Sequence, residues 1–144
     1  MEAITYLHLP SGQKPPPLEG YPPFKAVLVI EQPFTGQWQS LVSEWLVQGG
    51  CLYMMAWGRD CSSWNDSVDH ANGSAFNFGE IPDDAFVMTT WHADEPLREA
   101  LWFAAHTACH PTKVLDRTII VHISAKERRV ELLGEYQAAH DAAV

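Results

Sequence analysis

Residues 25–31 read KAVLVIE, a continuous apolar run with three β-branched side chains. A short run of this kind is typical of a strand buried on both faces, as in a parallel sheet. Three later runs have the same character: CLYMMAW at 51–57, AFVMTTW at 85–91 and TIIVHIS at 118–124. These four runs predict the strands of one sheet.

Helical patterns fill the gaps between the strands. Apolar residues at helical spacing predict an amphipathic helix over 37–48, capped by Thr35 and ended by Gly49 and Gly50. A second helix is predicted from Pro96 to about Ala108, with Asp94 as its N-cap.

Two further segments have weaker helical signals. Residues 66–72 predict one or two helical turns, with Asp66 as a cap. Residues 126–142 predict a closing helix, although Gly134 leaves a β-hairpin with the last strand as the alternative.

Alternating strands and helices predict an α/β fold, a three-layer sandwich around a mostly parallel sheet of four or five strands, Rossmann-like or flavodoxin-like. Residues 25–144 are expected to form this single domain. Residues 1–24 hold six of the ten prolines and are expected to form a proline-rich lead-in. Within it, 4–9 fits a short strand, and the rest is expected to drape over the domain, with a disordered arm as the alternative.

Negative charge is concentrated between residues 60 and 95. This segment has eight acidic residues and neither Lys nor Arg, in a chain whose formal net charge is −9. Charge of one sign in one region sets the local electrostatic potential and favours partners of opposite charge, but it says nothing about the fold. The acidic balance argues against nucleic acid and anionic membranes as partners, and no apolar run is long enough to span a membrane.

Cysteine usage and the first residues bear on location. Three cysteines are an odd number, which favours a reduced protein over a disulfide framework. The N-terminus lacks the basic and apolar regions of a signal peptide. We therefore expect a cytoplasmic protein.

Ligands of open parallel sheets bind beyond the carboxyl ends of the strands. Glu31, Asp60, Cys61 and His92 follow or end predicted strands, so the fold is expected to place them on one rim. Cys61 as nucleophile and His92 as base, with Asp60 or Asp94 orienting the imidazole, would form a catalytic group. The neighbouring carboxylates oppose this interpretation because they disfavour the thiolate, and the alternative is a cysteine that packs under Trp64.

Metal and cofactor motifs are weak. Asp60, Asp66 and Asp69 with Glu31 offer oxygen ligands for Mg²⁺ or Ca²⁺, but a solvated loop is the favoured interpretation. His106 and His110 are four residues apart, a spacing that suits a metal but also a helix end. Glycine-rich nucleotide-binding motifs are absent from the sequence. No metal and no cofactor are predicted.

Tryptophans accompany the acidic residues. Trp64 lies in a polar segment, where a partner contact and a buried anchor are equally good interpretations. Trp91 ends a strand and is expected to be half exposed.

Two segments resemble a known family. Residues 57–69, WGRDCSSWNDSVD, and 87–92, VMTTWH, are similar to a small bacterial family known only as a domain of unknown function. The resemblance covers roughly residues 25–125 and implies a bacterial cytosolic protein, but no activity.

The first functional hypothesis is a protein-binding module that captures a basic protein through the loops 58–70 and 91–95. Bacterial immunity proteins that neutralise basic nuclease toxins are similar in size and charge. The binding residues would be Glu31, Asp60, Trp64, Asp66, Asp69, Asp83, Asp84, Trp91 and Asp94. The second hypothesis is a small enzyme or ligand sensor that uses Asp60, Cys61 and His92. A homodimer joined through exposed tryptophans is a third.

Overall fold

The computed structural model describes residues 3–18 and 22–142 and contains a five-stranded, wholly parallel sheet. Its strand order is β1-β5-β2-β3-β4. The strands are β1 (Ala3–His8), β2 (Phe24–Ile30), β3 (Cys51–Gly58), β4 (Met88–His92) and β5 (Arg117–Ile123). The predicted α/β class and parallel sheet are confirmed.

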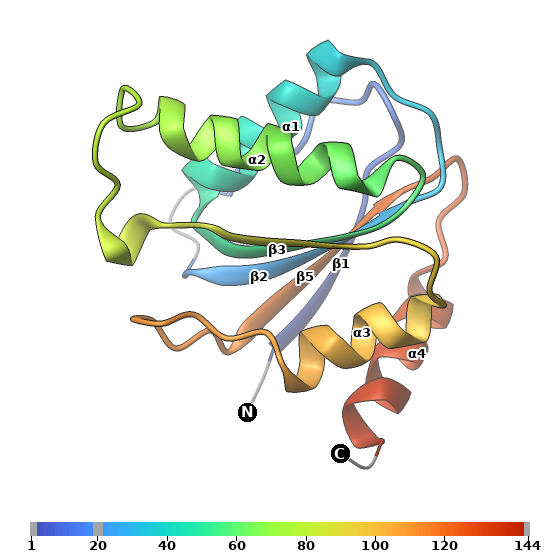
Figure 1. The fold of residues 1–144 in the computed structure, drawn as a ribbon. Helices are drawn as coiled ribbons and strands as arrows, with labels where there is room; N and C mark the ends of the chain where they lie inside the picture. The colour runs from blue at the N-terminus through green and yellow to red at the C-terminus, as the bar shows by residue number, and fades with distance from the viewer. Residues whose placement is uncertain (1–2, 19–21, 143–144) are drawn as a thin grey trace.

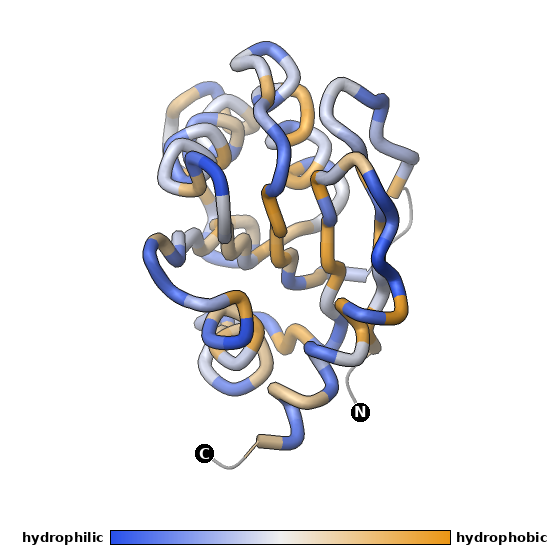
Figure 2. Tube along the Cα trace, turned by 90° about the vertical axis from the view of Figure 1, so that its right-hand side faces the viewer, coloured by the Kyte–Doolittle hydropathy of each residue, from blue (hydrophilic) through white to orange (hydrophobic). Residues whose placement is uncertain are grey.

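Helices cover both faces of the sheet. Figure 1 shows α1 (Gly36–Gly49) and α2 (Cys61–Ser74) above it, and α3 (Leu97–His106) and α4 (Arg129–Asp141) below it. A short 3-10 helix, η1 (Asp83–Ala85), precedes β4. Viewed from the side, the strands form an apolar band between the helices (Figure 2). The molecule is therefore a three-layer sandwich.

The central strand β2 shows why the apolar runs form strands. All seven of its residues are buried. Leu28 and Ile30 belong to the apolar cluster beneath α1 and α2, whereas Val27 and Val29 belong to the cluster against α3 and α4. Because successive side chains of a strand point to opposite faces, a strand between two helical layers needs an unbroken apolar sequence.

Helix α1 begins and ends as its sequence predicts. Thr35 Oγ1 accepts a hydrogen bond from the Trp38 backbone N–H at 3.2 Å. Gly50 adopts the left-handed conformation, and its N–H is directed to the carbonyls of Leu46 and Val47. The closing segment also forms a helix, α4, rather than a hairpin.

The proline-rich lead-in contributes a strand and a covering segment to the domain. Residues 3–8 form β1, an edge strand that pairs with β5. The proline-rich part then lies against α1. Trp38 Nε1–H donates to the Gln13 carbonyl at 2.8 Å, and Trp45 Nε1–H donates to the Pro16 carbonyl at 2.6 Å. These bonds explain how a stretch poor in backbone donors is held on the domain.

Two helix starts differ from the prediction. Helix α2 begins at Cys61, so Asp66 lies inside it and is not a cap. Asp94 is not the N-cap of α3, because Pro96 occupies that position. Asp60 and Asp94 instead adopt left-handed turns with φ of 47° and 61°, conformations that Asp tolerates better than most residues. Each turn redirects the chain from a strand end into the next helix.

Candidate functional site: the acidic edge of the sheet

The carboxyl ends of the strands share one rim, as expected, but the candidate residues on it face different layers. Cys61 is buried in the apolar cluster beneath α1 and α2. The His92 ring lies on the opposite face, 4.8 Å from the ring centroid of Phe103 in α3. Asp60 is exposed at the start of α2. The structure therefore does not bring Cys61 and His92 together.

His92 has a local set of partners instead. Its Nδ1 is 2.9 Å from Glu95 Oε1, and its Nε2 is 2.9 Å from Thr90 Oγ1. Trp57 Nε1–H donates to the Glu95 carbonyl at 2.7 Å. These bonds fix the turn between β4 and α3.

Trp64 is a core residue. Its side chain is 0% exposed, and its ring lies 5.3 Å from that of Phe34 and 6.3 Å from that of Trp38. The hypothesis that Trp64 contacts a partner is therefore wrong, and the alternative of a buried anchor holds. The segment looked like a polar loop, but it is an amphipathic helix with Trp64 and Val68 on its inner face.

The sequence did not reveal a polar cluster at the carboxyl ends of β2 and β5. These two adjacent strands lead into helices on opposite faces of the sheet, α1 and α4, and such a position is where open α/β sheets commonly bind ligands. Glu31 Oε1 is 2.5 Å from His122 Nε2 and 2.6 Å from the Arg128 guanidinium. Tyr6 Oη is 2.5 Å from His122 Nδ1. The sequence contains a single indication of this cluster, namely that His122 interrupts the apolar run 118–124.

Protonation in this cluster follows from burial and hydrogen bonding. Burial lowers the pKa of His122, although Glu31 opposes the shift. Burial acts to raise the pKa of Glu31, but hydrogen bonds from His122 and Arg128 outweigh it and leave this pKa below its usual range. A neutral His122 therefore donates its Nε2–H to the Glu31 carboxylate and accepts the Tyr6 hydroxyl proton at Nδ1. This tautomer is assigned from the partners.

The cluster holds α4 against the sheet. Besides its bond to His122, the Tyr6 oxygen accepts the Arg128 backbone N–H at 3.0 Å, at the start of α4. Arg128 also pairs with Glu131 in the first turn of the helix, at 3.0 Å. Because these groups satisfy one another, the arrangement is suited to fixing the helix rather than to binding a substrate.

Exposed acidic and aromatic side chains occur on β4, the edge strand at the front of Figure 1, and on the chain segments that precede and follow it. Phe78, Phe86 and Trp91 are 65%, 46% and 50% exposed. We call this surface the acidic–aromatic edge and define it by its exposed residues: Asp66, Asp69, Phe78, Asp83, Asp84, Phe86, Trp91 and Asp94. It includes most of the predicted binding residues, whereas Glu31 belongs to the polar cluster.

Asp69 joins α2 to β4 within this edge. Its Oδ1 accepts the Thr89 hydroxyl at 3.0 Å. Partial burial raises the pKa of Asp69, and the nearby Asp66 raises it further. A cation beside Asp69 would lower this pKa and so oppose the effects of burial and of Asp66. Asp84 differs, because a Thr112 hydrogen bond and then Lys113, at 3.8 Å, lower its pKa.

Asn72 fixes the chain that leads into β4. Its side-chain amide donates to the Ala85 carbonyl at 3.0 Å, and its oxygen accepts the Val87 N–H at 2.9 Å. Asn72 is buried in α2. The helix thus sets the position of the edge strand through both hydrogen bonds.

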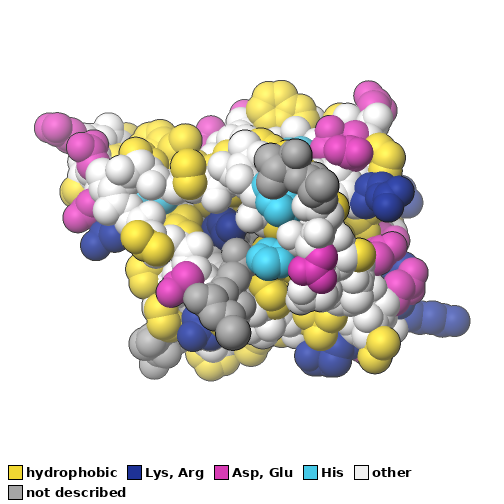
Figure 3. Space-filling model, turned by 90° about the horizontal axis from the view of Figure 1, so that it is seen from below, with side chains coloured by type: hydrophobic (Ala, Val, Ile, Leu, Met, Phe, Trp, Pro, Cys, Tyr) yellow, Lys and Arg dark blue, Asp and Glu magenta, His cyan; other side chains and the backbone are white. Residues whose placement is uncertain are grey.

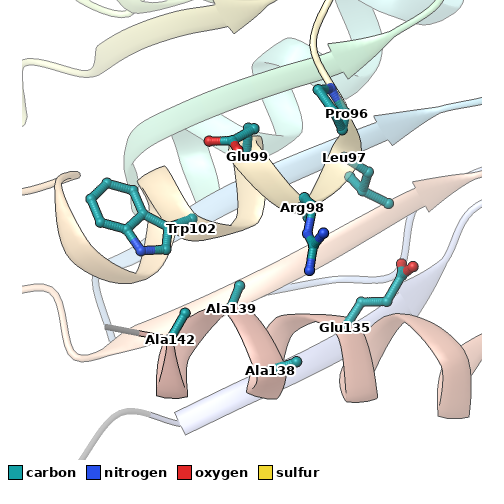
Figure 4. A pocket seen from close by; sticks show the side chains of 9 residues that line it. All are labelled: Pro96, Leu97, Arg98, Glu99, Trp102, Glu135, Ala138, Ala139 and Ala142. Carbon is teal, nitrogen blue, oxygen red and sulfur yellow. The ribbon is translucent and has the colours of Figure 1, made fainter. Parts of the chain in front are cut away.

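Hollows open on the surface of the described residues, and three of them can be compared with the candidate site. The largest, about 690 Å³, lies between α3 and α4, with Arg98 and Trp102 on one helix and Glu135 on the other (Figure 4). The face seen from below displays both basic and acidic side chains (Figure 3). A second hollow of about 560 Å³ lies over α1 and α2. The third, about 440 Å³, adjoins the start of β4. Asp60, Cys61 and His92 line none of these three.

Metal ligands are not gathered within the part of the chain that the structure describes, since no group of three or more His, Cys, Asp or Glu is placed to hold an ion. His106 Nε2 bonds to the Ala139 carbonyl, and His110 Nε2 bonds to the Phe86 carbonyl. Each of these histidines therefore has a separate structural partner. No helix among the described residues is long and apolar enough to cross a membrane.

Comparison with known proteins identifies the family. A family model, described as a domain of unknown function (DUF7684), matches residues 4–139. The chain belongs to this family. The matched range begins in β1 and ends in α4, so the DUF7684 domain spans the whole sheet and all four helices. Neither a curated protein nor a solved structure matches the chain.

Proposed function

We propose that this DUF7684 protein is a protein-binding module whose acidic–aromatic edge captures a basic polypeptide. The observation that supports this proposal is that exposed aromatic rings and exposed carboxylates occur together on β4 and on the chain segments next to it. Aromatic side chains are the usual anchors of protein interfaces. Carboxylates around such anchors accelerate and select a partner of opposite charge.

The charge of the edge has little compensation from its own chain. Residues 60–95 contain neither Lys nor Arg. Lys113, which pairs with Asp84 at 3.8 Å, is a cation that this surface draws from elsewhere in the chain. A basic partner would supply the missing counter-charge and would cover the exposed apolar rings at the same time.

The enzyme hypothesis has less support. It requires Cys61 and His92 to act on one substrate, yet their side chains lie on opposite faces of the sheet. The Cys61 thiol is also buried among apolar side chains, away from a substrate on the surface.

A peptide selection tests the proposal. We expect a random peptide library panned on the folded protein at low salt to be enriched in Lys and Arg next to aromatic residues. Binding of the selected peptides should weaken at least tenfold between about 0.15 M and 0.5 M NaCl, because salt screens exposed charge. Affinity can be measured by calorimetry or by fluorescence anisotropy.

Two triple variants test whether peptide binding depends on the carboxylates of the acidic–aromatic edge. The test variant is Asp66→Asn, Asp83→Asn and Asp94→Asn, in which Asn also tolerates the left-handed turn at position 94. The control is Glu44→Gln, Glu99→Gln and Glu135→Gln, on exposed helical positions. Each variant removes three negative charges from the chain. We expect the test variant to lose binding and the control to keep it; equal loss in both would overturn the proposal.

We also infer that the protein is located in the cytoplasm. The resemblance of residues 57–69 and 87–92 to a bacterial family supports a bacterial source. Cys51, Cys61 and Cys109 are free thiols, which suits a reducing compartment. An intact thiol content after purification in air would support this inference, and a disulfide-linked dimer would count against it.

A further inference from the structure

β4 is an edge strand, so one side of its backbone lies outside the hydrogen-bonded sheet. β4 pairs with β3 from Met88 to His92, and no other strand among the described residues pairs with it. Alternate residues of an edge strand direct N–H and C=O groups away from the sheet. These groups form a template on which another extended chain can add.

β4 lacks three of the usual protections of an edge strand, namely lysine, proline and a β-bulge. Natural edges avoid pairing through lysine, proline, β-bulges or a covering segment. The sequence MTTWH contains neither Lys nor Pro. The register between β3 and β4 is regular, without a bulge.

The hollow at the start of β4 fits a long cationic side chain. Ile81, Phe86 and Met88 line its apolar part, and Asp69 lines its polar part. Lys and Arg bury an aliphatic stem on apolar surface and keep the charged end beside polar groups. A lysine or arginine entering here could place its stem along Phe86 and its charge beside Asp69, where Thr89 already holds the carboxylate.

Two occupants of this edge can be compared by their charge: a second copy of this protein and a separate basic chain. A second copy joined through the same β4 edge would place Asp69 and Asp94 opposite like charges, which is unfavourable. The other sheet edge, β1, lies near Arg128 and Arg129, but Arg128 pairs with Glu31 and Glu131 and Arg129 stacks on Tyr6. A separate basic chain therefore fits β4 better than another copy of this protein does.

We infer that the partner binds by strand addition: a basic, extended segment pairs with the outer edge of β4 and inserts a Lys or Arg side chain into the hollow beside Asp69. This inference rests on the proposed function and specifies its binding mode. Backbone pairing supplies affinity, and the hollow and the surrounding carboxylates supply the preference for a basic sequence.

The experiment uses a synthetic probe, a peptide of about ten residues in which Lys and Thr alternate, a length that suits a strand. Two N-methylated forms have the same charge and the same number of methyl groups. Methyl groups on alternate residues block one edge of an extended peptide and leave the other edge free. Methyl groups on consecutive central residues block both edges.

We expect the parent and alternate-methylated peptides to bind the protein alike. The consecutive-methylated peptide should bind at least tenfold more weakly, because several net-favourable backbone bonds are lost. Bound parent peptide should slow hydrogen exchange at the β4 amides. Asp69→Asn should weaken binding of the parent peptide but should have less effect on a peptide with Gln in place of Lys.

The outcomes separate the two proposals. If all three peptides bind equally and the Asp66→Asn, Asp83→Asn, Asp94→Asn variant binds none, the acidic edge binds a basic chain but strand addition is wrong. If the parent peptide binds that variant as well as the wild type, the proposed function itself fails. A stable dimer in concentration-dependent sizing, with β4 amides protected without peptide, would assign the edge to a second copy and overturn the inference.

Discussion

Replacing Gly58 with alanine should destabilise the protein by about 3–5 kcal/mol, a loss at the upper end for single substitutions. Gly58 ends β3 with φ of 104°, a conformation that disfavours any side chain. A Cβ atom at this position would lie 2.2 Å from the Ile30 carbonyl oxygen. That carbonyl also accepts the Arg59 N–H at 2.9 Å. Relief of the clash would therefore move two central strands of the sheet.

Two glycines provide matched controls. Gly12 has φ of 86° but open space where a Cβ atom would lie, so Gly12→Ala should cost only the backbone strain, about 1–2 kcal/mol. Gly134 lies in α4 with open space, and Gly134→Ala should stabilise the protein by about 0.5–1 kcal/mol. Urea unfolding followed by tryptophan fluorescence measures all three. Equal unfolding midpoints for Gly58→Ala and Gly12→Ala would refute the close approach of β2 and β3.

Acidification below about pH 6.5 should lower the free energy of unfolding, because His122 is held neutral in the folded protein. Burial lowers the pKa of His122, so the unfolded chain takes up a proton first as the pH falls. The stabilisation is complete above the unfolded pKa and is lost as the pH falls toward the folded pKa. Glu31, whose pKa is also lowered, adds a further loss below about pH 4.5. For one proton, the slope approaches about 1.4 kcal/mol per pH unit.

His122→Gln tests the source of this slope. Glutamine can still donate to Glu31 and accept from Tyr6, but it does not titrate. We expect the variant to be less stable at neutral pH and to have a flatter profile between about pH 5 and 7. His140→Gln, at an exposed position in α4, is the control and should keep the wild-type slope. A His122→Gln profile as steep as that of the wild type would contradict the assignment.

The fold was predictable because its strands have unambiguous patterns. Residues 25–31 and 51–57 are apolar on both faces, and a parallel sheet between two helical layers is the arrangement that buries them. Residues 3–8 were harder to place, because their pairing partner in β5 is more than a hundred residues away. Nothing local in the sequence specifies that contact.

The candidate site was predictable only in part. Charge located the acidic segment, since eight acids without a cation are visible in the sequence alone. Exposure was visible only in part: Trp91, at a strand end, was expected to be half exposed and is 50% exposed, whereas the polar surroundings of Trp64 did not reveal that its side chain is buried. The Tyr6, His122 and Glu31 cluster combines residues from three segments of the chain, so only the folded sheet reveals it.

Binding of a basic chain at the acidic–aromatic edge is tested most directly by an NMR titration with the Lys–Thr peptide. The backbone amide resonances of 66–70 and 88–94 should shift together in a saturable, salt-sensitive way, while those of α3 and α4 should stay in place. Shifts centred on the groove between α3 and α4, or on Glu31 and His122, would place binding elsewhere and contradict the proposed function.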